Sequence, residues 1–402
     1  MHERADMAET KLCVLLVDDE PNVLSGLRRS LRPMRDKLEI VFASGAHEAL
    51  DIMAKVPLDL IVSDMRMPGM DGIQLLGEVR ARFPGIVRFA LSGDVSRGAL
   101  LASAGLVHRY LAKPCDTQEL QTALSSVWEL RPLVTNNDLK NTLSQIESLP
   151  AAPALYRSLV RALDAPSAAG EDVGRIIAID IAMTTKVLQV AGWALFGDNQ
   201  LFFSVPHAVD SLGIETLRAM ASSGGALASL EHEAFERMSL GPLWNHARSV
   251  ADFARQIARS SNAGGEIADQ AYVGGLLHDV GKLAFAATTP VAHAAASVRA
   301  VTDNIGLLDA ERDVIGATHP EAGAYLLGIW GLAGPIVEAV RFHHNPSSVA
   351  RRGFSAVTAV HVADALLGDD SATNLDQPYL DGLGVCDQIE TWRALTGETA
   401  VA

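Results

Sequence analysis

The sequence predicts two folds in succession: α/β, with a five-stranded parallel doubly wound sheet, and then an all-helical (all-α) domain. Residues 11–130 alternate short apolar runs with amphipathic segments, which is typical of a parallel sheet covered by helices on both faces. From about residue 139 the strand-like runs stop, while helical periodicity broken by Gly and Pro continues. The length of 402 residues is sufficient for two or three domains.

Each expected element of the α/β domain follows from its own stretch of sequence. The apolar runs "KLCVLLVDD", "EIVFAS", "LDLIVSD", "VRFALSGD" and "VHRYLAKP" predict the strands. The amphipathic stretches "NVLSGLRRSL", "AHEALDIMA", "DGIQLLGEVRARF", "SRGALLASA" and "TQELQTALSSVWEL" predict the helices between and after them. In such sheets, ligands bind outside the carboxyl ends of the strands.

The domain boundaries come from changes in composition. We predict the α/β domain at 11–130, a linker at 131–138, the helical domain at 139–368 and a tail with a short helix at 369–402. The polar, proline-containing stretch "RPLVTNNDLKN" predicts the linker. Segments such as "ALYRSLVRAL", "TTKVLQVAGWALFG", "ADFARQIARS" and "GPIVEAVRF" predict helices of the second domain.

The composition excludes several classes of function. A net charge of −15 and a pI of about 5.2 argue against direct DNA binding and against binding to anionic lipid. No apolar run approaches the roughly 20 residues that cross a bilayer, and no signal peptide is recognisable. The three cysteines, Cys13, Cys115 and Cys386, are far apart. We therefore expect a reduced, cytoplasmic protein without membrane contact.

Acidic residues occur where two predicted strands end. Asp18 and Asp19 follow the first strand, and Asp64 ends the third. Neighbouring parallel strands end at one edge, so the three carboxylates should converge and require a hard cation such as Mg²⁺. Ser92 and Lys113 end the next two strands, where a hydroxyl and an ammonium can hold phosphoryl oxygens. A lone Asp after a strand is usually a helix cap, but this explanation does not account for five such groups together.

With the motifs "LLVDDE", "IVSDMRMPGMDG", "ALSGD" and "YLAKP", residues 11–130 resemble the receiver domain of bacterial two-component response regulators. The resemblance implies that Asp64 accepts a phosphoryl group from a sensor histidine kinase. It also implies that the Mg²⁺ ligands are Asp18, Asp19, Asp64 and the backbone carbonyl of Arg66. The switch groups that it implies are Ser92, Lys113 and Tyr110.

Five segments of the helical domain each offer an imidazole, two of them with a nearby carboxylate. In "LLHDVGK", His278 and Asp279 come at the expected end of a helix, with Gly281 expected to stop it. Imidazole-rich sites prefer Fe, Mn, Zn or Ni to Mg. A lone helical histidine is more often an ordinary core or surface group, which is our interpretation of His207, His232 and His293. The candidate metal ligands are His246, His278, Asp279, His319, His343, His344 and Asp364.

Residues 139–368 resemble the HDOD domain, a helical relative of the HD phosphohydrolases, through "SLPAAPALYRSLVRAL", "IDIAMTTKVLQVA", "SVPHAVDSLGIETLRAM", "LLHDVGK", "HPEAGAYLLGIWGL" and "FHHNP". The stretch "VAGWALFG" departs from that family, which often has Asn-Ser where Gly192 and Trp193 stand. The seven candidate ligands match those of the HD-GYP cyclic-di-GMP phosphodiesterases, and Lys282 matches their motif lysine. Those enzymes continue His-His-Glu into a Gly-Tyr-Pro turn, whereas this chain has Asn345 and "PSSVARRG".

Two functional hypotheses follow. In the first, phosphorylation rearranges an output domain that binds a protein or nucleotide partner, in a chain that self-associates or acts alone. In the second, a metal-dependent phosphohydrolase is gated by the receiver. The missing turn favours the first, and the ligand set favours the second. We favour a module without catalysis, because a resemblance of fold does not establish an activity.

Overall fold

The computed structural model describes residues 11–93, 105–166, 168–193, 202–222, 227, 240–350, 353–368 and 375–399. The first part is a parallel sheet with strand order β2-β1-β3-β4-β5. Its strands are β1 (Leu12–Val17), β2 (Leu38–Ala43), β3 (Leu60–Asp64), β4 (Val87–Ser92) and β5 (Arg109–Ala112). Its helices are α2 (Pro21–Ser30), η1 (Arg32–Met34), α3 (Ala46–Met53), α4 (Gly72–Arg82) and α6 (Thr117–Leu130). The predicted helix at "SRGALLASA" lies outside the described residues.

The sheet forms where the sequence is continuously apolar. Strands β3 and β4 are buried along their whole length, as expected for strands covered on both faces. Pairing of β1 with both β2 and β3 makes it an interior strand of the sheet, so that the residues after β1 lie beside those after β3. The predicted fold of this part of the chain is confirmed.

The second part is built of helices, and the described residues beyond β5 contain no strand that pairs into a sheet. The first group is η2 (Arg131–Leu133), α7 (Asn137–Ser144), α8 (Pro153–Asp164), α9 (Gly170–Ile177), α10 (Ile181–Ala191), α11 (Val205–Leu212) and α12 (Ile214–Ser222). The second group is α14 (Leu240–Ser260), α15 (Gly265–Leu277), α16 (Val280–Thr288), α17 (Pro290–Thr302), α18 (Leu307–Val314), α19 (His319–Ile329), α20 (Gly334–Phe342), η4 (Pro346–Ser348) and α21 (Ala356–Leu367). The tail adds α22 (Gln377–Leu383), η5 (Cys386–Gln388) and α23 (Ile389–Thr399).

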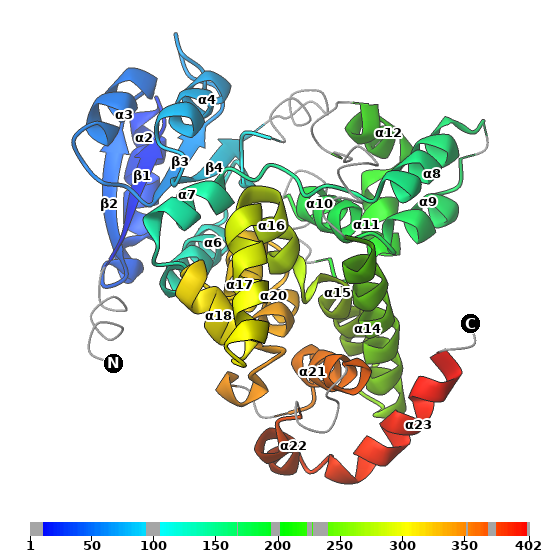
Figure 1. Ribbon diagram of the computed structural model, residues 1–402. Coiled ribbons are helices and arrows are strands. Elements are labelled where there is room, and N and C mark those ends of the chain that lie inside the picture. The colour runs from blue at the N-terminus through cyan, green and yellow to red at the C-terminus, as the bar shows by residue number, and fades with distance from the viewer. Residues whose placement is uncertain are drawn as a thin grey trace.

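The predicted linker and tail contain packed structure. Residues 131–138 hold η2 and the start of α7, and Leu133 and Leu139 are buried. In the tail, Trp392 of α23 is fully buried in a cluster with residues of α14 and α21. Figure 1 shows α6 and α7 between the sheet and the later helices. None of the helices described is long and apolar enough to cross a membrane.

The sheet and the helical domain share a polar contact at the amino-terminal side of β4 and β5. The His108 Nδ1 atom accepts a hydrogen bond from the backbone N–H of Arg88, so its Nε2 atom carries the proton that is donated to the carbonyl of Ser144. The Arg88 guanidinium also donates to that carbonyl, and Gln189 of α10 donates to the carbonyl of His108. These bonds join β4 and β5 to α7 and α10 directly.

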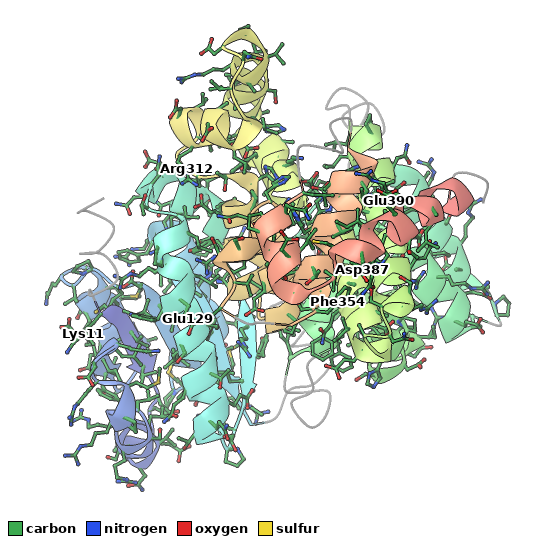
Figure 2. The ribbon with its side chains drawn as sticks, turned by 90° about the horizontal axis from the view of Figure 1, so that it is seen from below. Lys11, Glu129, Arg312, Phe354, Asp387 and Glu390 are labelled. Carbon is green, nitrogen blue, oxygen red and sulfur yellow. The ribbon has the colours of Figure 1, made fainter. Side chains whose placement is uncertain are left out.

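A close helix contact provides the second link. At Gly328 in α19, an added Cβ would overlap the side chain of Leu130 at the end of α6. The absence of a side chain therefore lets α6 and α19 approach closely. In Figure 2, α6, on which Glu129 is labelled, lies between the sheet and the later helices.

Candidate functional site

The three predicted carboxylates of the α/β domain meet at the carboxyl edge of the sheet. Oxygen atoms of Asp18, Asp19 and Asp64 lie within 4.8 Å of one another. Asp18 is fully buried and Asp64 is nearly so. They are held there because β1 and β3 are adjacent and end at the same level. An all-oxygen group of this size suits Mg²⁺.

Lys113 supplies a cation to this group from the residue after β5. Its Nζ atom lies 2.7 Å from Asp18 Oδ2 and 2.9 Å from Asp64 Oδ2. Burial alone would lower the pKa of the Lys113 ammonium, but the hydrogen bonds that it donates to both carboxylates raise the pKa above its ordinary value. The predicted Lys113 is thus placed where it can offset negative charge, and Ser92 ends the neighbouring strand β4.

The predicted switch residue Tyr110 faces the helical domain. Its ring is buried and lies 4.8 Å, centroid to centroid, from that of Trp193, at an angle of 54°. Trp193 is at the position where the sequence departs from the HDOD pattern, and its indole Nε1–H has no hydrogen-bond partner among the described residues. The role predicted for the Arg66 carbonyl stays a prediction.

In the helical domain, all seven predicted metal ligands converge from five places in the chain. His246 lies on α14 and Asp364 on α21, while the other five ligands lie at helix ends. His278 directly follows α15, Asp279 precedes α16 and His319 begins α19. The overlapping clusters, each with ligand atoms within 4.8 Å, are His246, His278 and Asp364; His278, Asp279 and His343; and His319, His343 and His344.

The two carboxylates, Asp364 and Asp279, each lie close to more than one imidazole of the cluster. Asp364 Oδ1 lies 3.0 Å from His246 Nε2 and 3.6 Å from His278 Nε2, and its Oδ2 lies 3.7 Å from His344 Nδ1. Asp279 faces both sides, with Oδ2 3.4 Å from His278 Nε2 and Oδ1 3.2 Å from His319 Nε2. Asp279 can therefore serve as a bridge between two cation positions.

The hydrogen-bond partners of three buried histidines fix their tautomers. The Nδ1 atoms of His278 and His343 lie 2.7 Å from the carbonyls of Gly275 and Val340. A carbonyl oxygen accepts and never donates, so each Nδ1 carries the proton. The Nδ1 of His319 likewise donates to a carboxylate oxygen at 2.8 Å. All three rings consequently aim an Nε2 lone pair at the common space, as histidines that bind metals do.

These Nε2 atoms have no partner that could donate to them. The Nε2 atoms of His278, His319 and His343, together with Asp279 Oδ1, are buried without a hydrogen bond in the part of the chain that the structure describes. Asp279 Oδ1 lies 3.2 Å from His319 Nε2 without a hydrogen bond, and the Asp279 carboxylate holds the pKa of His278 above its ordinary value against the effect of burial. Burial and the neighbouring His344 hold the pKa of His343 well below its ordinary range, which keeps its lone pair available. The residues fit a bound cation.

Close backbone packing holds the His-Asp turn. At Gly281, an added Cβ would overlap the backbone carbonyl of His319. The prediction that Gly281 stops a helix is wrong, since α15 ends at Leu277 and Gly281 lies within α16. The glycine is needed for contact between helices and not for a turn.

Glu311 on α18 belongs to the site although its sequence context did not indicate it. Its fully buried carboxylate accepts from both the backbone N–H and the Nδ1 of His319, each at 2.8 Å. Its place in an amphipathic helix eight residues before His319 matches no metal motif. The signal that could have identified it is an acid at a position of α18 that faces the core, beside Ala310.

The remaining histidines are not among the clustered ligand atoms, although His293 lies close enough to Glu311 and His319 for their charges to affect its pKa. His207 is exposed and packs against Phe202, and His293 faces Phe285. His361 shares α21 with a ligand but bonds the carbonyl of His343 and the backbone N–H of Asp376. The interpretation of His232 falls outside the described residues.

One edge of the cluster is open. The side chains of His246 and His344 are 33% and 35% exposed, whereas His278, His319 and Asp279 are 2% exposed or less. Lys282, the predicted neighbour, is 25% exposed and donates to Asp279 Oδ2 at 2.7 Å. Beyond the His pair, Asn345 leads into the short helix η4. A closed structural metal site would have no such accessible edge.

Comparison with known families identifies both domains. Residues 14–125 match the response regulator receiver domain, and residues 149–346 match the HDOD domain. This chain is a response regulator with a receiver domain and an HDOD domain. Its HDOD domain retains, in addition, the complete ligand set predicted by resemblance to HD phosphohydrolases.

Individual relatives resemble parts of the chain. It is 30% identical over 203 residues to an uncharacterized protein of Treponema pallidum (strain Nichols), covering 50% of this chain and 38% of that protein. It is 36% identical over 111 residues to the hydrogenase transcriptional regulatory protein HoxA of Cupriavidus necator, covering 27% of this chain and 22% of HoxA. The chain thus spans well under half the length of these two curated relatives.

A solved structure also resembles the receiver. The signal receiver domain of an HD domain-containing protein from Pseudomonas fluorescens Pf-5 is 33% identical, with a TM-score of 0.29. The similarity covers 30% of this chain and 96% of that one.

Proposed function

We propose that Asp64 accepts a phosphoryl group from a sensor histidine kinase, with Mg²⁺ held by Asp18, Asp19, Asp64 and the Arg66 carbonyl. The support is the convergence of the three carboxylates with Lys113, which lies within 3 Å of both Asp18 and Asp64. Mg²⁺ and Lys113 would together offset the charge that a phosphoryl group adds.

The test is intact-mass measurement after incubation with acetyl phosphate and Mg²⁺. Wild-type protein should gain one phosphoryl group, and Asp64→Ala should gain none. Asp51→Ala, an exposed aspartate of α3, is the matched control and should be labelled like wild type. Full labelling of Asp64→Ala would refute the assignment.

We propose further that the HDOD domain binds a transition metal, such as Fe, Mn, Zn or Ni, through His246, His278, Asp279, His319, His343, His344 and Asp364. The observation that carries this proposal is the set of buried Nε2 atoms without donors, all directed into one space. Burying so many lone pairs costs free energy unless a cation satisfies them.

Elemental analysis of protein purified without chelator tests the metal site. Metal should co-purify with wild type and fall to background in the double variant His278→Ala, Asp279→Ala. His207→Ala removes an exposed imidazole far from the cluster in sequence and should keep the metal. Wild-type protein free of metal would contradict the proposal.

We propose that the output of the HDOD domain is binding of a protein or nucleotide partner. The contact between Tyr110 and Trp193 would carry the signal, because a change at the phosphorylation site that moves Tyr110 must repack Trp193. A beryllofluoride complex should then change hydrogen exchange in α10, which ends two residues before Trp193. Changes in hydrogen exchange that are confined to the loop after Asp64 would contradict this coupling between the domains.

The second candidate function is metal-dependent hydrolysis of a phosphate ester, favoured by the open edge between His246 and His344. Metal ions held there would supply Lewis acidity and an activated water. Lys282, beside Asp279, is placed to offset charge near the same opening. Hydrolysis of bis(p-nitrophenyl) phosphate that requires Mn²⁺ or Fe²⁺ and disappears in the His278, Asp279 double variant would establish this function.

Cyclic-di-GMP is a poor candidate for its substrate. Positioning of a diester supplies a large part of a rate enhancement, and the Gly-Tyr-Pro turn that shapes the nucleotide site in the related enzymes is missing here. In its place are Asn345 and η4; Arg351 and Arg352 lie outside the described residues. We expect no useful turnover of cyclic-di-GMP by metal-loaded protein, with or without beryllofluoride. Product that forms in wild type and not in the double variant would contradict this.

A further inference from the structure

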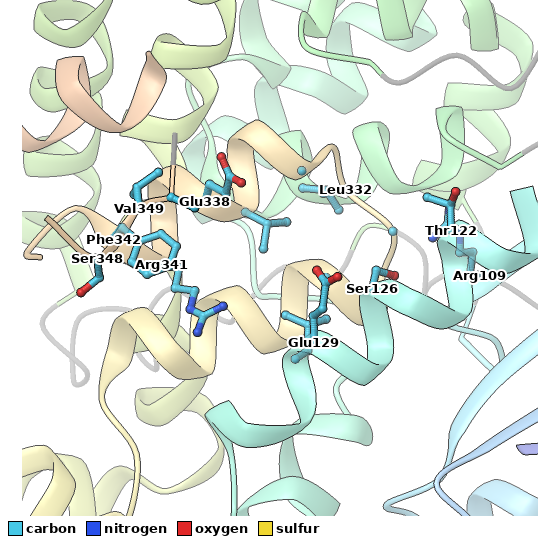
Figure 3. Close-up of a pocket in the computed structure, with 16 residues that line it drawn as sticks. Arg109, Thr122, Ser126, Glu129, Leu332, Glu338, Arg341, Phe342, Ser348 and Val349 are labelled. Carbon is cyan, nitrogen blue, oxygen red and sulfur yellow. The ribbon is translucent and has the colours of Figure 1, made fainter. Parts of the chain in front are cut away.

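A cavity of about 500 Å³ lies between the receiver and HDOD domains, far along α19 from the metal cluster. The receiver contributes β5 and α6, and the HDOD domain contributes α20, η4 and the turn after α19. Cavities of this size between domains are common ligand sites. Figure 3 shows Arg109 and Thr122 at one end, and Arg341, Phe342 and Val349 at the other.

Two arginines line the cavity without a protein partner. Neither Arg109 nor Arg341 makes a hydrogen bond or an ion pair with a carboxylate within the described ranges. Arg341 instead lies over the ring of Phe342, with its guanidinium carbon 4.7 Å from the centroid. Arginine is seldom withdrawn from water without a partner, because its guanidinium loses hydration.

The charges differ between the two ends. Burial lowers the pKa of Arg341, and Glu129 of α6 and Glu338 of α20, which also line the cavity, offset this shift in part. Burial lowers the pKa of Arg109, and the negative charge of Glu119 offsets this shift in part. Glu119 forms no ion pair with Arg109 in the described parts of the chain, and it does not line the cavity. The Arg109 end is therefore where an anionic group would be best stabilised.

The middle of the cavity is apolar. Leu130 of α6 faces Leu332 and Val337 of the HDOD domain. Three glycines of the same wall, at 328, 331 and 334, leave room beside these side chains. At Gly331, an added Cβ would lie 3.1 Å from the Arg109 Nε atom, so this glycine keeps space for the guanidinium.

We propose that this cavity binds a small anionic ligand with an apolar body, whose carboxylate, phosphate or sulfonate group pairs with Arg109. The apolar body lies against Leu130, Leu332 and Val337. Arg109 immediately precedes Tyr110 in β5, so an occupant contacts the same strand that presents the switch residue to Trp193. Ligand binding and receiver phosphorylation would then affect each other reciprocally.

A matched pair of fluorescent probes tests the site. 8-Anilinonaphthalene-1-sulfonate carries an apolar body and one anionic group, and N-phenyl-1-naphthylamine has the same body without the anion. In wild-type protein the anionic probe should bind at least about tenfold more tightly than the neutral probe. This is the gain in affinity expected from one charge-assisted hydrogen bond. Arg109→Gln should abolish that preference while the neutral probe still binds.

Two further variants complete the experiment. Val337→Trp should fill the cavity and weaken binding of both probes, and Arg35→Gln, a surface arginine, should change neither. Each variant is first compared with wild type by circular dichroism and thermal unfolding. Equal affinity of the two probes for wild type, or anionic-probe binding that survives both Arg109→Gln and Val337→Trp, would overturn the proposal.

Discussion

In the receiver domain, the Lys113 ammonium lies 2.7 Å from Asp18 and 2.9 Å from Asp64, whereas in the HDOD domain three buried imidazole nitrogens face one another without a donor among the residues that the structure describes. Both sites gather groups that attract a cation. The receiver supplies part of the positive charge itself, through Lys113, as a site proposed to bind Mg²⁺ and a phosphoryl group reversibly would require. The HDOD cluster has Lys282 at one carboxylate oxygen, and its inward nitrogens can be satisfied only from outside. The proposed phosphorylation switch and the proposed metal centre thus differ in whether the chain itself provides part of the positive charge.

The largest expected effect that separates the two sites is that of chelation. Treatment of the full chain with EDTA should lower the unfolding temperature by about 5–15 °C, because metal that binds only the folded chain stabilises it by mass action. Added Zn²⁺ or Mn²⁺ should restore the loss, and Mg²⁺ alone should not. Differential scanning calorimetry measures this. The His278→Ala, Asp279→Ala variant is the control, and EDTA should not change its unfolding temperature. If EDTA leaves the unfolding temperature of wild type unchanged, the proposed difference between the two sites is wrong.

The next effect concerns the contact between the two regions. Trp193→Ala should destabilise the protein by about 3–5 kcal/mol, since it empties a buried aromatic site. It should also diminish the beryllofluoride-induced change in hydrogen exchange across α10, while acetyl phosphate still labels Asp64. Trp392→Ala, which empties an equally buried site at α23, should lower stability but leave that exchange response intact. The same exchange response in both variants would show that Trp193 does not couple the domains.

A smaller effect is expected at Glu311, which orients His319. Glu311→Gln should weaken metal affinity by about 10–100-fold, because the carboxylate fixes the tautomer and raises the basicity of the ligand. Competition with a chromogenic chelator measures the affinity. Glu321→Gln alters a nearby acid that caps α19 and should have little effect on the metal. Equal affinities for Glu311→Gln and wild type would place Glu311 outside the site's function.

The smallest effect is a pH dependence at the domain interface. Burial lowers the pKa of Lys186 from 10.5 to about 8, although the ammonium donates to the Glu147 carbonyl and to Gln189. Between these pH values the unfolded chain binds more protons than the folded chain, so folding is favoured as pH rises. The cost of keeping Lys186 protonated is fully present below pH 8 and is relieved above it.

Urea unfolding from pH 7.5 to 9.5 tests this for wild type and Lys186→Met. Relative to the variant, wild type should gain stability with rising pH, by at most about 1.4 kcal/mol per pH unit. The exposed Lys55→Met serves as a control whose difference from wild type should stay constant. A constant difference for Lys186→Met as well would contradict the prediction.

Much of this arrangement follows from local sequence. Strand ends in a parallel sheet meet at one edge, so the positions of Asp18, Asp64 and Lys113 within the motifs were enough to bring them together. The candidate metal ligands could be named because five segments each offer an imidazole, two of them with a nearby carboxylate, in a pattern that resembles HD phosphohydrolases. Glu311 and the Tyr110–Trp193 contact could not be predicted in the same way. Each depends on which helix packs against which. The identities of these residues in a single sequence do not reveal that packing.

The polar stretch after residue 130 shows the same limit. Its composition predicts a linker, yet Ser144 at the end of α7 accepts hydrogen bonds from Arg88 and His108 of the receiver and its hydroxyl lies 3.1 Å from that of Tyr325. Exposed polar residues on one face of a short helix look like a loop when the buried face contains only a few apolar positions, such as Leu139 and Leu143.

Helix α19 begins with His319 at the metal cluster and reaches the receiver at Gly328, about 14 Å along its axis. The fit of Leu130 against Gly328 restricts how such proteins can arise by exchange of modules. A receiver transplanted from another regulator would bring its own final helix, and a bulkier residue at the position of Leu130 would push α19 and its histidine away from the other ligands. Exchange of the receiver alone would therefore require a residue at this position that fits against Gly328 as Leu130 does.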